Sequence, residues 1–234
     1  MNSACQDAAD SKGQCPCKIP RLLLAFSLMA LCLASFLADD AVAAFFAGLR
    51  SPSLNTLAGT LNCIGDWPAH TLFGLLAAGV AWRLRRKDVT RLFLAMILAS
   101  SLAGVTVNVV RCTTGRPRPL TKAQDGFYGM RKDGKWIGFE NRYQSFPSAH
   151  TATAVAFSGV VLFAGIRGGW LIALFGPLVG CARIYSRAHH FSDVVTATCI
   201  GLLFSWWAWR FVQRRWRKDQ AACGITASPP SYPP

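Results

Sequence analysis

The chain has 234 residues, of which 52% are hydrophobic and only 15% are charged, and its mean hydropathy is +0.30. These values argue against a soluble domain, because the apolar residues come in blocks of membrane-spanning length rather than at amphipathic spacing. The formal charge of +14 does not indicate a nucleic-acid partner, since Lys and Arg flank the apolar blocks, as in loops that face the cytoplasm and anionic lipid.

The first 20 residues form a polar segment ahead of the first apolar block. This segment carries Asp7 and Asp10 and lacks the basic, apolar and cleavage regions of a signal peptide. We therefore expect an N-terminal tail over residues 1–20, a membrane domain over residues 21–218 and a disordered tail over residues 219–234, which ends in ASPPSYPP.

Six apolar blocks predict an all-α protein with six transmembrane helices. Their approximate ranges are 22–37, 69–82, 92–110, 151–166, 170–185 and 194–212. The segment 41–64 is also apolar, but Arg50, Ser51 and Pro52 interrupt it, and its large apolar residues lie at near-helical spacing. We expect short helices in the membrane interface there, with a seventh span as the alternative.

Six spans place both termini on one side, which we expect to be the cytoplasm. The basic residues of the opposite side are then concentrated in two loops, one beginning at Arg111 and the other at Arg183 to Arg187. A dense basic cluster on the translocated side runs against the positive-inside tendency. We therefore expect these two loops to bind an anion.

Three short segments meet this outer boundary: RCTTGRPRP (111–119), FPSAH (146–150) and ARIYSRAHHFSD (182–193). Together they supply several arginines, two or three histidines and one carboxylate, without the carboxylate cluster that a divalent metal requires. The guanidinium group of arginine forms paired hydrogen bonds with phosphate oxygens. A histidine ring can carry a phosphoryl group covalently or donate a proton. The set therefore predicts phosphoryl transfer without a metal or other cofactor.

Spacing suggests roles for individual residues in this set. His189 and Asp193 are four residues apart, so on a helix their side chains would share a face. The carboxylate could then orient one ring nitrogen of the histidine and leave the other free to attack. This spacing favours His189 over His190 as the nucleophile. Ser148 and His150 are expected at a helix N-terminus, where free backbone N–H groups and the helix dipole attract the same anion.

The three segments resemble the signature of the type 2 phosphatidic acid phosphatase superfamily of membrane phosphatases. That signature is a Lys, six residues and Arg-Pro; then Pro-Ser-Gly-His; then Ser-Arg, five residues, His, three residues and Asp. The chain keeps these spacings over roughly residues 92–209, with Arg111 in place of the Lys, Ala149 in place of the Gly and Ala182 in place of the Ser. We expect these replacements to affect substrate preference and rate more than reaction type.

The resemblance implies a six-helix core that needs no metal, and it implies a role for each matching residue. The implied phosphate-binding residues are Arg111, Arg118, Ser148 and Arg183, and the implied catalytic residues are His150 as general acid, His189 as nucleophile and Asp193 as its partner. The expected activity is hydrolysis of a lipid phosphate through a phosphohistidine, on the periplasmic side of a bacterial inner membrane.

Several alternatives remain within this interpretation. A lipid-to-lipid phosphotransferase would use the same phosphohistidine, and a non-enzymatic lipid or anion transporter would use the basic cluster for binding alone. Transporters usually place charged residues near the bilayer midplane, whereas these apolar blocks nearly lack charge. A phosphate-binding site lined by arginines is compatible with several substrates: phosphatidic acid, phosphatidylglycerol phosphate, an isoprenoid diphosphate and lipid A phosphates.

The long loop from Leu120 to Phe146 contains aromatic residues that predict an interfacial anchor or, as we favour, part of a lid over the site. The basic residues in and just before this loop are expected to face solvent or lipid headgroups. They are Arg116, Lys122, Arg131, Lys132 and Lys135.

Overall fold

The computed structural model describes residues 21–121 and 123–222. Its helices are α1 (Arg21–Phe36), α2 (Asp39–Gly48), α3 (Pro52–Ile64), α4 (Trp67–Arg83), α5 (Lys87–Thr114), α6 (Ala149–Phe163), α7 (Gly169–Ala173), α8 (Phe175–Tyr185) and α9 (Phe191–Ala222). The predicted all-α class is confirmed. The expected tail over residues 1–20 lies outside the described residues, as does most of the C-terminal tail. Helix α9 continues past the expected end of the sixth span at residue 212 and extends four residues into the expected tail, to Ala222.

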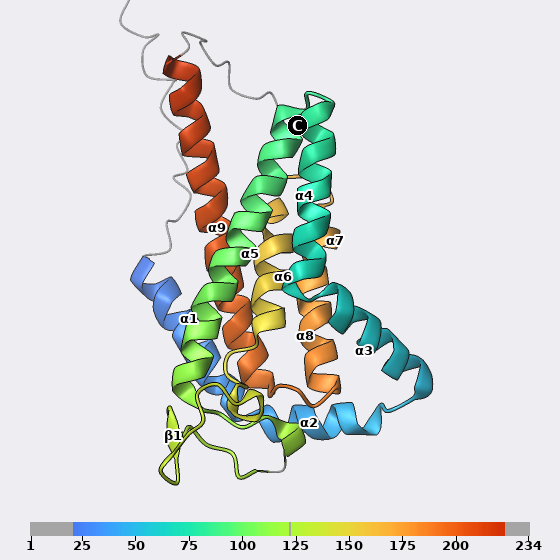
Figure 1. The fold of residues 1–234 in the computed structure, drawn as a ribbon, viewed down its shortest axis with the longest axis vertical. Coiled ribbons are helices and arrows are strands. Elements are labelled where there is room, and N and C mark those ends of the chain that lie inside the picture. The colour runs from blue at the N-terminus through green and yellow to red at the C-terminus, as the bar shows by residue number, and fades with distance from the viewer. Residues whose placement is uncertain (1–20, 122, 223–234) are drawn as a thin grey trace, which may run out of the picture.

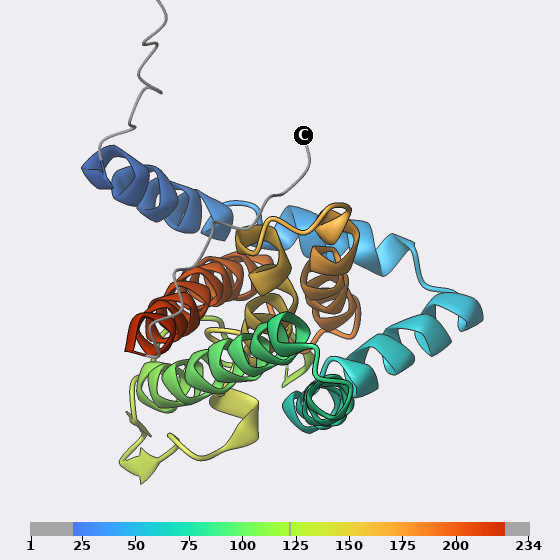
Figure 2. The same ribbon diagram turned by 90° about the horizontal axis from the view of Figure 1, so that it is seen from above.

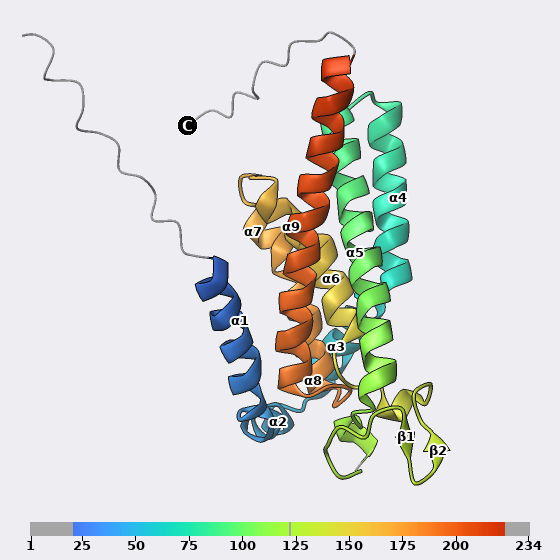
Figure 3. The same cartoon turned by 90° about the vertical axis from the view of Figure 1, so that its left-hand side faces the viewer.

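The connection between α5 and α6 is the one long non-helical segment between described helices. It contains the 3-10 turns η1 (Pro119–Thr121) and η2 (Asn141–Tyr143) and a small antiparallel hairpin of β1 (Arg131–Lys132) and β2 (Lys135–Trp136). The hairpin turn is Asp133-Gly134, and both residues have positive φ, which such tight hairpin turns require. Figures 1 and 3 place this connection at the end of the bundle where α2 lies.

Helix α6 is the centre of the bundle, with α5, α8 and α9 around it (Figure 2). All residues from Thr151 to Val161 are buried, so no face of this stretch is left for lipid. Gly201 of α9 packs against α6 so closely that a Cβ atom there would lie 2.8 Å from the carbonyl oxygen of Ala152. Small residues that allow such backbone approach are typical of helix packing in membranes.

Helix α4 shows how side chains are sorted between the bundle and its surroundings. Its buried face carries small or polar residues, namely His70, Thr71, Gly74, Ala78 and Ala81. Its exposed face carries large apolar residues, namely Leu72, Phe73, Leu75, Leu76, Val80 and Trp82. Large apolar side chains on the outside indicate that lipid rather than water surrounds the helix, as in an integral membrane protein.

Within the described residues, two helical segments are long and apolar enough to cross a membrane, Lys87–Thr121 and Phe191–Lys218, and the bent pair α1–α2 would make a third. Helix α6 and the α7–α8 pair are shorter apolar helices. They occupy the fourth and fifth predicted spans, and the fifth is broken at Leu174. Pro177 accounts for the break, because it has no N–H for the Ala173 carbonyl and is tolerated in the first turn of a new helix. The six-span count stays a prediction.

The segment 41–64 forms two short helices, as the sequence predicts. Helix α2 bends by 59° from α1 and lies across the end of the bundle (Figure 1). The predicted interruption marks the start of α3, since the Ser51 hydroxyl accepts the backbone N–H of Leu54 and Pro52 is the first helical residue. Interfacial placement of these helices stays a prediction.

Candidate active site

The three segments singled out from the sequence lie at one end of the bundle, beside α2 and the hairpin (Figure 1). The first continues from the C-terminus of α5, the second leads into α6, and the third joins α8 to α9. The chain turns sharply after α5 at Gly115, which has a φ of 63° and whose missing Cβ would collide with the Gly129 carbonyl. This turn carries Arg116 and Arg118 back over the bundle end.

His189 lies in the turn between α8 and α9, and only 2% of its surface is exposed. Its Nδ1 atom is 2.7 Å from the carbonyl oxygen of Ser145. Because a carbonyl only accepts hydrogen bonds, Nδ1 carries the proton, and the neutral ring keeps its lone pair on Nε2. The ring is therefore held in the tautomer that a nucleophile needs.

The predicted bond between His189 and Asp193 is replaced by a longer contact. The Asp193 carboxylate is 3.6 Å from Nδ1, within ion-pair range but longer than a hydrogen bond. Its oxygens accept instead from the Ser145 hydroxyl at 2.5 Å, the His190 backbone N–H at 2.8 Å and Arg116 at 2.8 Å. Sequence spacing predicted correctly that the two side chains lie close together, although His189 precedes α9. Ser145 contacts both, since its carbonyl accepts from His189 and its hydroxyl donates to Asp193.

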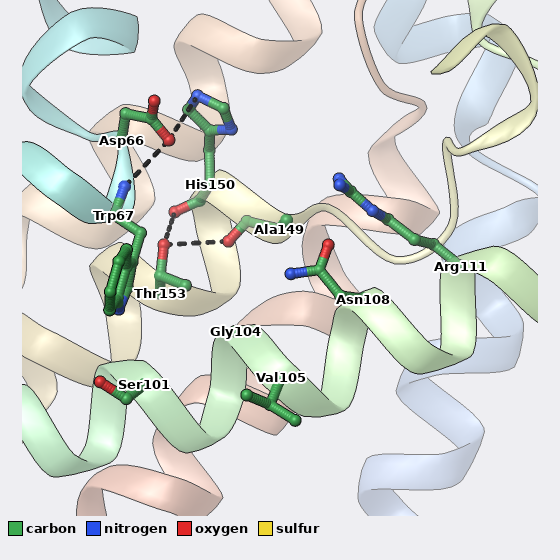
Figure 4. Close-up of a pocket in the computed structure, with 10 residues that line it drawn as sticks. All are labelled: Asp66, Trp67, Ser101, Gly104, Val105, Asn108, Arg111, Ala149, His150 and Thr153. Atoms are coloured by element: carbon green, nitrogen blue, oxygen red, sulfur yellow. Dashed lines mark hydrogen bonds and ion pairs between the residues drawn. The ribbon is translucent and has the colours of Figure 1, made fainter. Parts of the chain in front are cut away.

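His150 lies in the first turn of α6, as predicted, and borders a cavity of about 330 Å³ between α4, α5 and α6 (Figure 4). Arg111 and Asn108 line the same cavity from α5. The Nε2 atom of His150 is 3.5 Å from the carboxylate of Asp66. His189 borders a second cavity, of about 420 Å³, together with His190 and Arg187. Burial and the charge of Arg183 lower the pKa of His150, and His189 also acts on this pKa, so the two predicted histidines lie near each other at the same end of the bundle.

Arg111, Arg118 and Arg183 present unpaired donors. In each, the Nε atom is buried and has no hydrogen-bond partner among the residues described, and none of the three forms an ion pair with them. Arg118 makes one neutral contact, from Nη2 to Asn141 at 2.7 Å. Buried donors without partners are rare in folded proteins, and arginines bind phosphate through such donors.

Ser148 is fully buried at the N-cap of α6, and its side chain makes no capping bond there. Its hydroxyl oxygen accepts from Thr151 at 2.9 Å, so its own proton is free for another acceptor. Free N–H groups at this helix start favour an anion. The predicted position of Ser148 at a helix N-terminus is therefore observed, while its phosphate-binding role stays a prediction.

Arg116 is the functional residue that the sequence analysis assigned wrongly. It was expected at the surface, yet its side chain is 1% exposed and forms ion pairs at 2.8 Å with Asp39, Asp125 and Asp193. These acids come from α2, the long loop and α9, so one guanidinium ties three segments together. Counting the Lys and Arg residues of a loop gives its charge, but it does not show which of these side chains are buried. No pattern in the sequence indicated the contact with Asp39, which lies 77 residues away along the chain.

The aromatic residues of the long loop divide into two groups. Phe127 contacts Phe36 and Phe146, with ring centroids 6.0 and 5.4 Å apart, and lies over the Arg116 guanidinium. Trp136 and Phe139 are exposed. Phe127 therefore shields the buried ion pairs from water, and the expected lid over the substrate stays a prediction.

Asp39, Asp125 and His190 bring ligand atoms within 4.8 Å of one another. The sequence analysis expected no such cluster, because these residues are far apart in the chain. Arg116 donates to both carboxylates at 2.8 Å, so a guanidinium already supplies the positive charge there. Its hydrogen bond to Asp125 also holds the pKa of that carboxyl below its usual value. The expected absence of a metal stays a prediction.

Burial lowers the pKa of His189 to about 4, so the ring is neutral near pH 7. In the unfolded chain the same ring titrates near pH ~6.5. Between these values the unfolded state binds a proton that the folded state does not. The contribution of the neutral ring to the free energy of unfolding is therefore complete above pH ~6.5 and falls as the pH drops towards about 4.

When the pH is lowered from ~7 to ~5, the free energy of unfolding should fall by about 2 kcal/mol more for the wild type than for a His189→Asn variant, which lacks this ring. SDS titration in mixed micelles at the two pH values measures both changes. Equal losses would contradict the low pKa.

Comparison with known proteins identifies the family. Residues 88–217, more than half of the chain, match the model of the PAP2 superfamily. The undecaprenyl-diphosphatase BcrC of Bacillus subtilis (strain 168) is 44% identical over 64 residues, which are 26% of this chain and 33% of that protein. Lipid phosphate phosphatase 1 of Arabidopsis thaliana is 24% identical over 180 residues, covering 64% of this chain and 54% of that protein. The chain thus matches between a third and about half of the length of these relatives.

Two crystal structures share the fold. LpxE of Aquifex aeolicus superposes with a TM-score of 0.53 at 22% identity, covering 74% of this chain and 94% of that one. The PAP2-type phosphatidylglycerolphosphate phosphatase of Bacillus subtilis superposes with a TM-score of 0.57 at 19% identity, covering 82% and 96%. The matched range 88–217 includes all three motif segments, so the resemblance seen in the sequence is confirmed and the chain belongs to the PAP2 superfamily.

Proposed function

We propose that the protein is a metal-independent lipid phosphatase that works through a phosphohistidine on His189. The observation that carries this proposal is the surplus of buried, unpaired arginine donors beside a neutral histidine whose Nε2 lone pair is free. Arg111, Arg118 and Arg183 would grip the phosphoryl oxygens, where charge is spread in the transition state. The names of the relatives, which describe lipid phosphate and undecaprenyl diphosphate phosphatases, support the same reaction class.

In the first step, the Nε2 lone pair of His189 attacks phosphorus, and the bond from phosphorus to the lipid oxygen breaks. His150 gives a proton to that oxygen, so the lipid leaves as a neutral alcohol or, from a diphosphate, as a lipid monophosphate. The Nδ1–H group of His189 keeps its proton and its hydrogen bond to the Ser145 carbonyl, and the Asp193 carboxylate stabilises the positive charge that develops on the ring.

In the second step, a water molecule attacks the phosphohistidine, and the bond between phosphorus and Nε2 breaks. His150, which lost its proton in the first step, takes a proton from this water, and inorganic phosphate leaves. A lipid hydroxyl in place of the water would give a lipid-to-lipid phosphotransferase with the same residues. The cavity beside His150 and Arg111 can hold the part of the lipid next to the phosphate.

The proposed topology has six spans, with α7 and α8 together forming the fifth and with both termini in the cytoplasm. The site then lies on the periplasmic side of a bacterial inner membrane. A lipid phosphate would reach the arginines from the outer leaflet while its tail stays in the hydrocarbon, which surrounds the exposed apolar face of α4.

The purified protein should release inorganic phosphate from at least one of phosphatidic acid, phosphatidylglycerol phosphate, an isoprenoid diphosphate and a lipid A phosphate. We expect the rate to be unchanged, within about twofold, after dialysis against a chelator, because arginines rather than a metal stabilise the transferring group. Transfer to an added lipid hydroxyl without phosphate release would indicate the phosphotransferase. Lack of turnover with every lipid, or loss of activity with the chelator, would contradict the proposal.

A further inference from the structure

Asp66 stands at the start of α4, outside the three motif segments, and its carboxylate faces the Nε2 atom of His150 (Figure 4). Its Oδ1 atom is 3.5 Å from Nε2 of His150 and accepts the backbone N–H of Trp67 at 2.9 Å. The second contact caps α4 and fixes the direction of the carboxylate. Asp66 and His150 also line the same cavity, next to Arg111.

We propose that Asp66 is a positioning residue for the general acid: it holds the Nε2–H of His150 and stabilises the protonated ring, so that Nδ1–H is the proton given to the leaving oxygen. This inference rests on the proposed function. A carboxylate can only accept from a ring N–H, so the contact selects which nitrogen faces the substrate. Figure 4 shows the other ring nitrogen of His150 turned away from Asp66, towards the side on which Arg111 lies.

The charges around His150 explain why such a partner is needed. Burial is the main cause that lowers the pKa of His150, and the positive charges of Arg183 on α8 and Arg111 on α5 add to it, because they disfavour a second positive charge. Asp66 supplies the opposite charge from the start of α4. Its side chain is 54% exposed, so the carboxylate reaches both the ring and solvent. A general acid that gives its proton to solvent before the substrate arrives would not work, and the negative charge of Asp66 opposes that loss.

The test is the leaving-group dependence of an Asp66→Asn variant. Asparagine keeps the N-cap but removes the charge. Because kcat/KM reports the first chemical step, it should fall by at least about tenfold for dioctanoyl phosphatidic acid, whose alkoxide needs a proton. It should fall by less than about threefold for p-nitrophenyl phosphate, whose leaving group needs little help. The alkaline limb of the pH profile with the lipid should also move to lower pH.

Two further variants separate this role from a merely structural one. In a His150→Ala background, adding Asp66→Asn should change kcat/KM little, because the two residues act as a unit. Asp88→Asn, on an exposed carboxylate in the first turn of α5, should leave both substrates unaffected.

Equal losses for the two substrates, or additive losses in the His150→Ala background, would overturn the assignment of Asp66 while leaving the phosphatase intact. A wild-type protein that hydrolyses neither substrate nor any of the other lipid phosphates would instead overturn the proposed function, and this inference with it.

Discussion

Replacing His189 with asparagine should lower phosphate release from the preferred lipid by at least about 10³-fold, because it removes Nε2, the atom that we propose attacks phosphorus. Asparagine is a suitable probe, since its amide nitrogen occupies the place of Nδ1 and can still donate to the Ser145 carbonyl, which lies 2.7 Å from Nδ1. The side chain keeps its structural bond and loses Nε2. The loss is measured as inorganic phosphate released by protein of matched thermal stability.

The neighbouring histidine provides the matched control. The Nε2 atom of His190 is 3.2 Å from the Pro117 carbonyl, and only its backbone N–H contacts Asp193. His190→Asn should therefore keep activity within about tenfold of the wild type. An acid-labile, base-stable label from ³²P-lipid should form on the wild type and on the His190 variant, but not on the His189 variant. Activity that survives in the His189 variant, or a label that is stable to acid, would exclude this nucleophile.

The order of the helices follows largely from local sequence, whereas their ends do not. Apolar blocks placed every long helix, because burial in lipid depends on composition over about 20 residues. The blocks could not show that the fifth breaks at Leu174 or that α9 extends through Arg214 and Lys218 to Ala222. Those ends depend on Pro177 and on helix-forming polar residues, which hydropathy alone does not register.

The site divides in the same way between local and distant information. Motif spacing placed Arg111, His150, Arg183 and His189 together at one end of the bundle, because each lies within a turn or two of a helix end. Spacing gave no means of finding contacts across long separations. Arg116 meets Asp39 and Asp193, each 77 residues away along the chain. Asp66 meets His150 although α4 and α5 lie between them in the chain. A single sequence does not encode such pairs in any periodic pattern.

Replacing Arg116 with methionine should destabilise the protein by about 3–5 kcal/mol, the largest stability change we expect from one substitution here. Methionine fills much of the same volume, but Asp39 and Asp193 are buried and would be left as uncompensated charges. Asp193 would also lose a donor that fixes it beside Ser145, so phosphate release should fall even at temperatures where the variant is folded. SDS titration in mixed micelles measures the first effect and phosphate release the second.

An exposed arginine and a second-site change test whether burial is the cause. Arg142 pairs with Glu140 at 2.6 Å, but its side chain is 63% exposed, so Arg142→Met should change stability by less than about 1 kcal/mol. Adding Asp39→Asn to the Arg116 variant should restore about 1–3 kcal/mol, because it removes one unpaired charge and keeps an acceptor for the Ser192 N–H. If the double variant is less stable than Arg116→Met alone, then the interaction between Arg116 and Asp39 is not what stabilises the contact of α2 with the site.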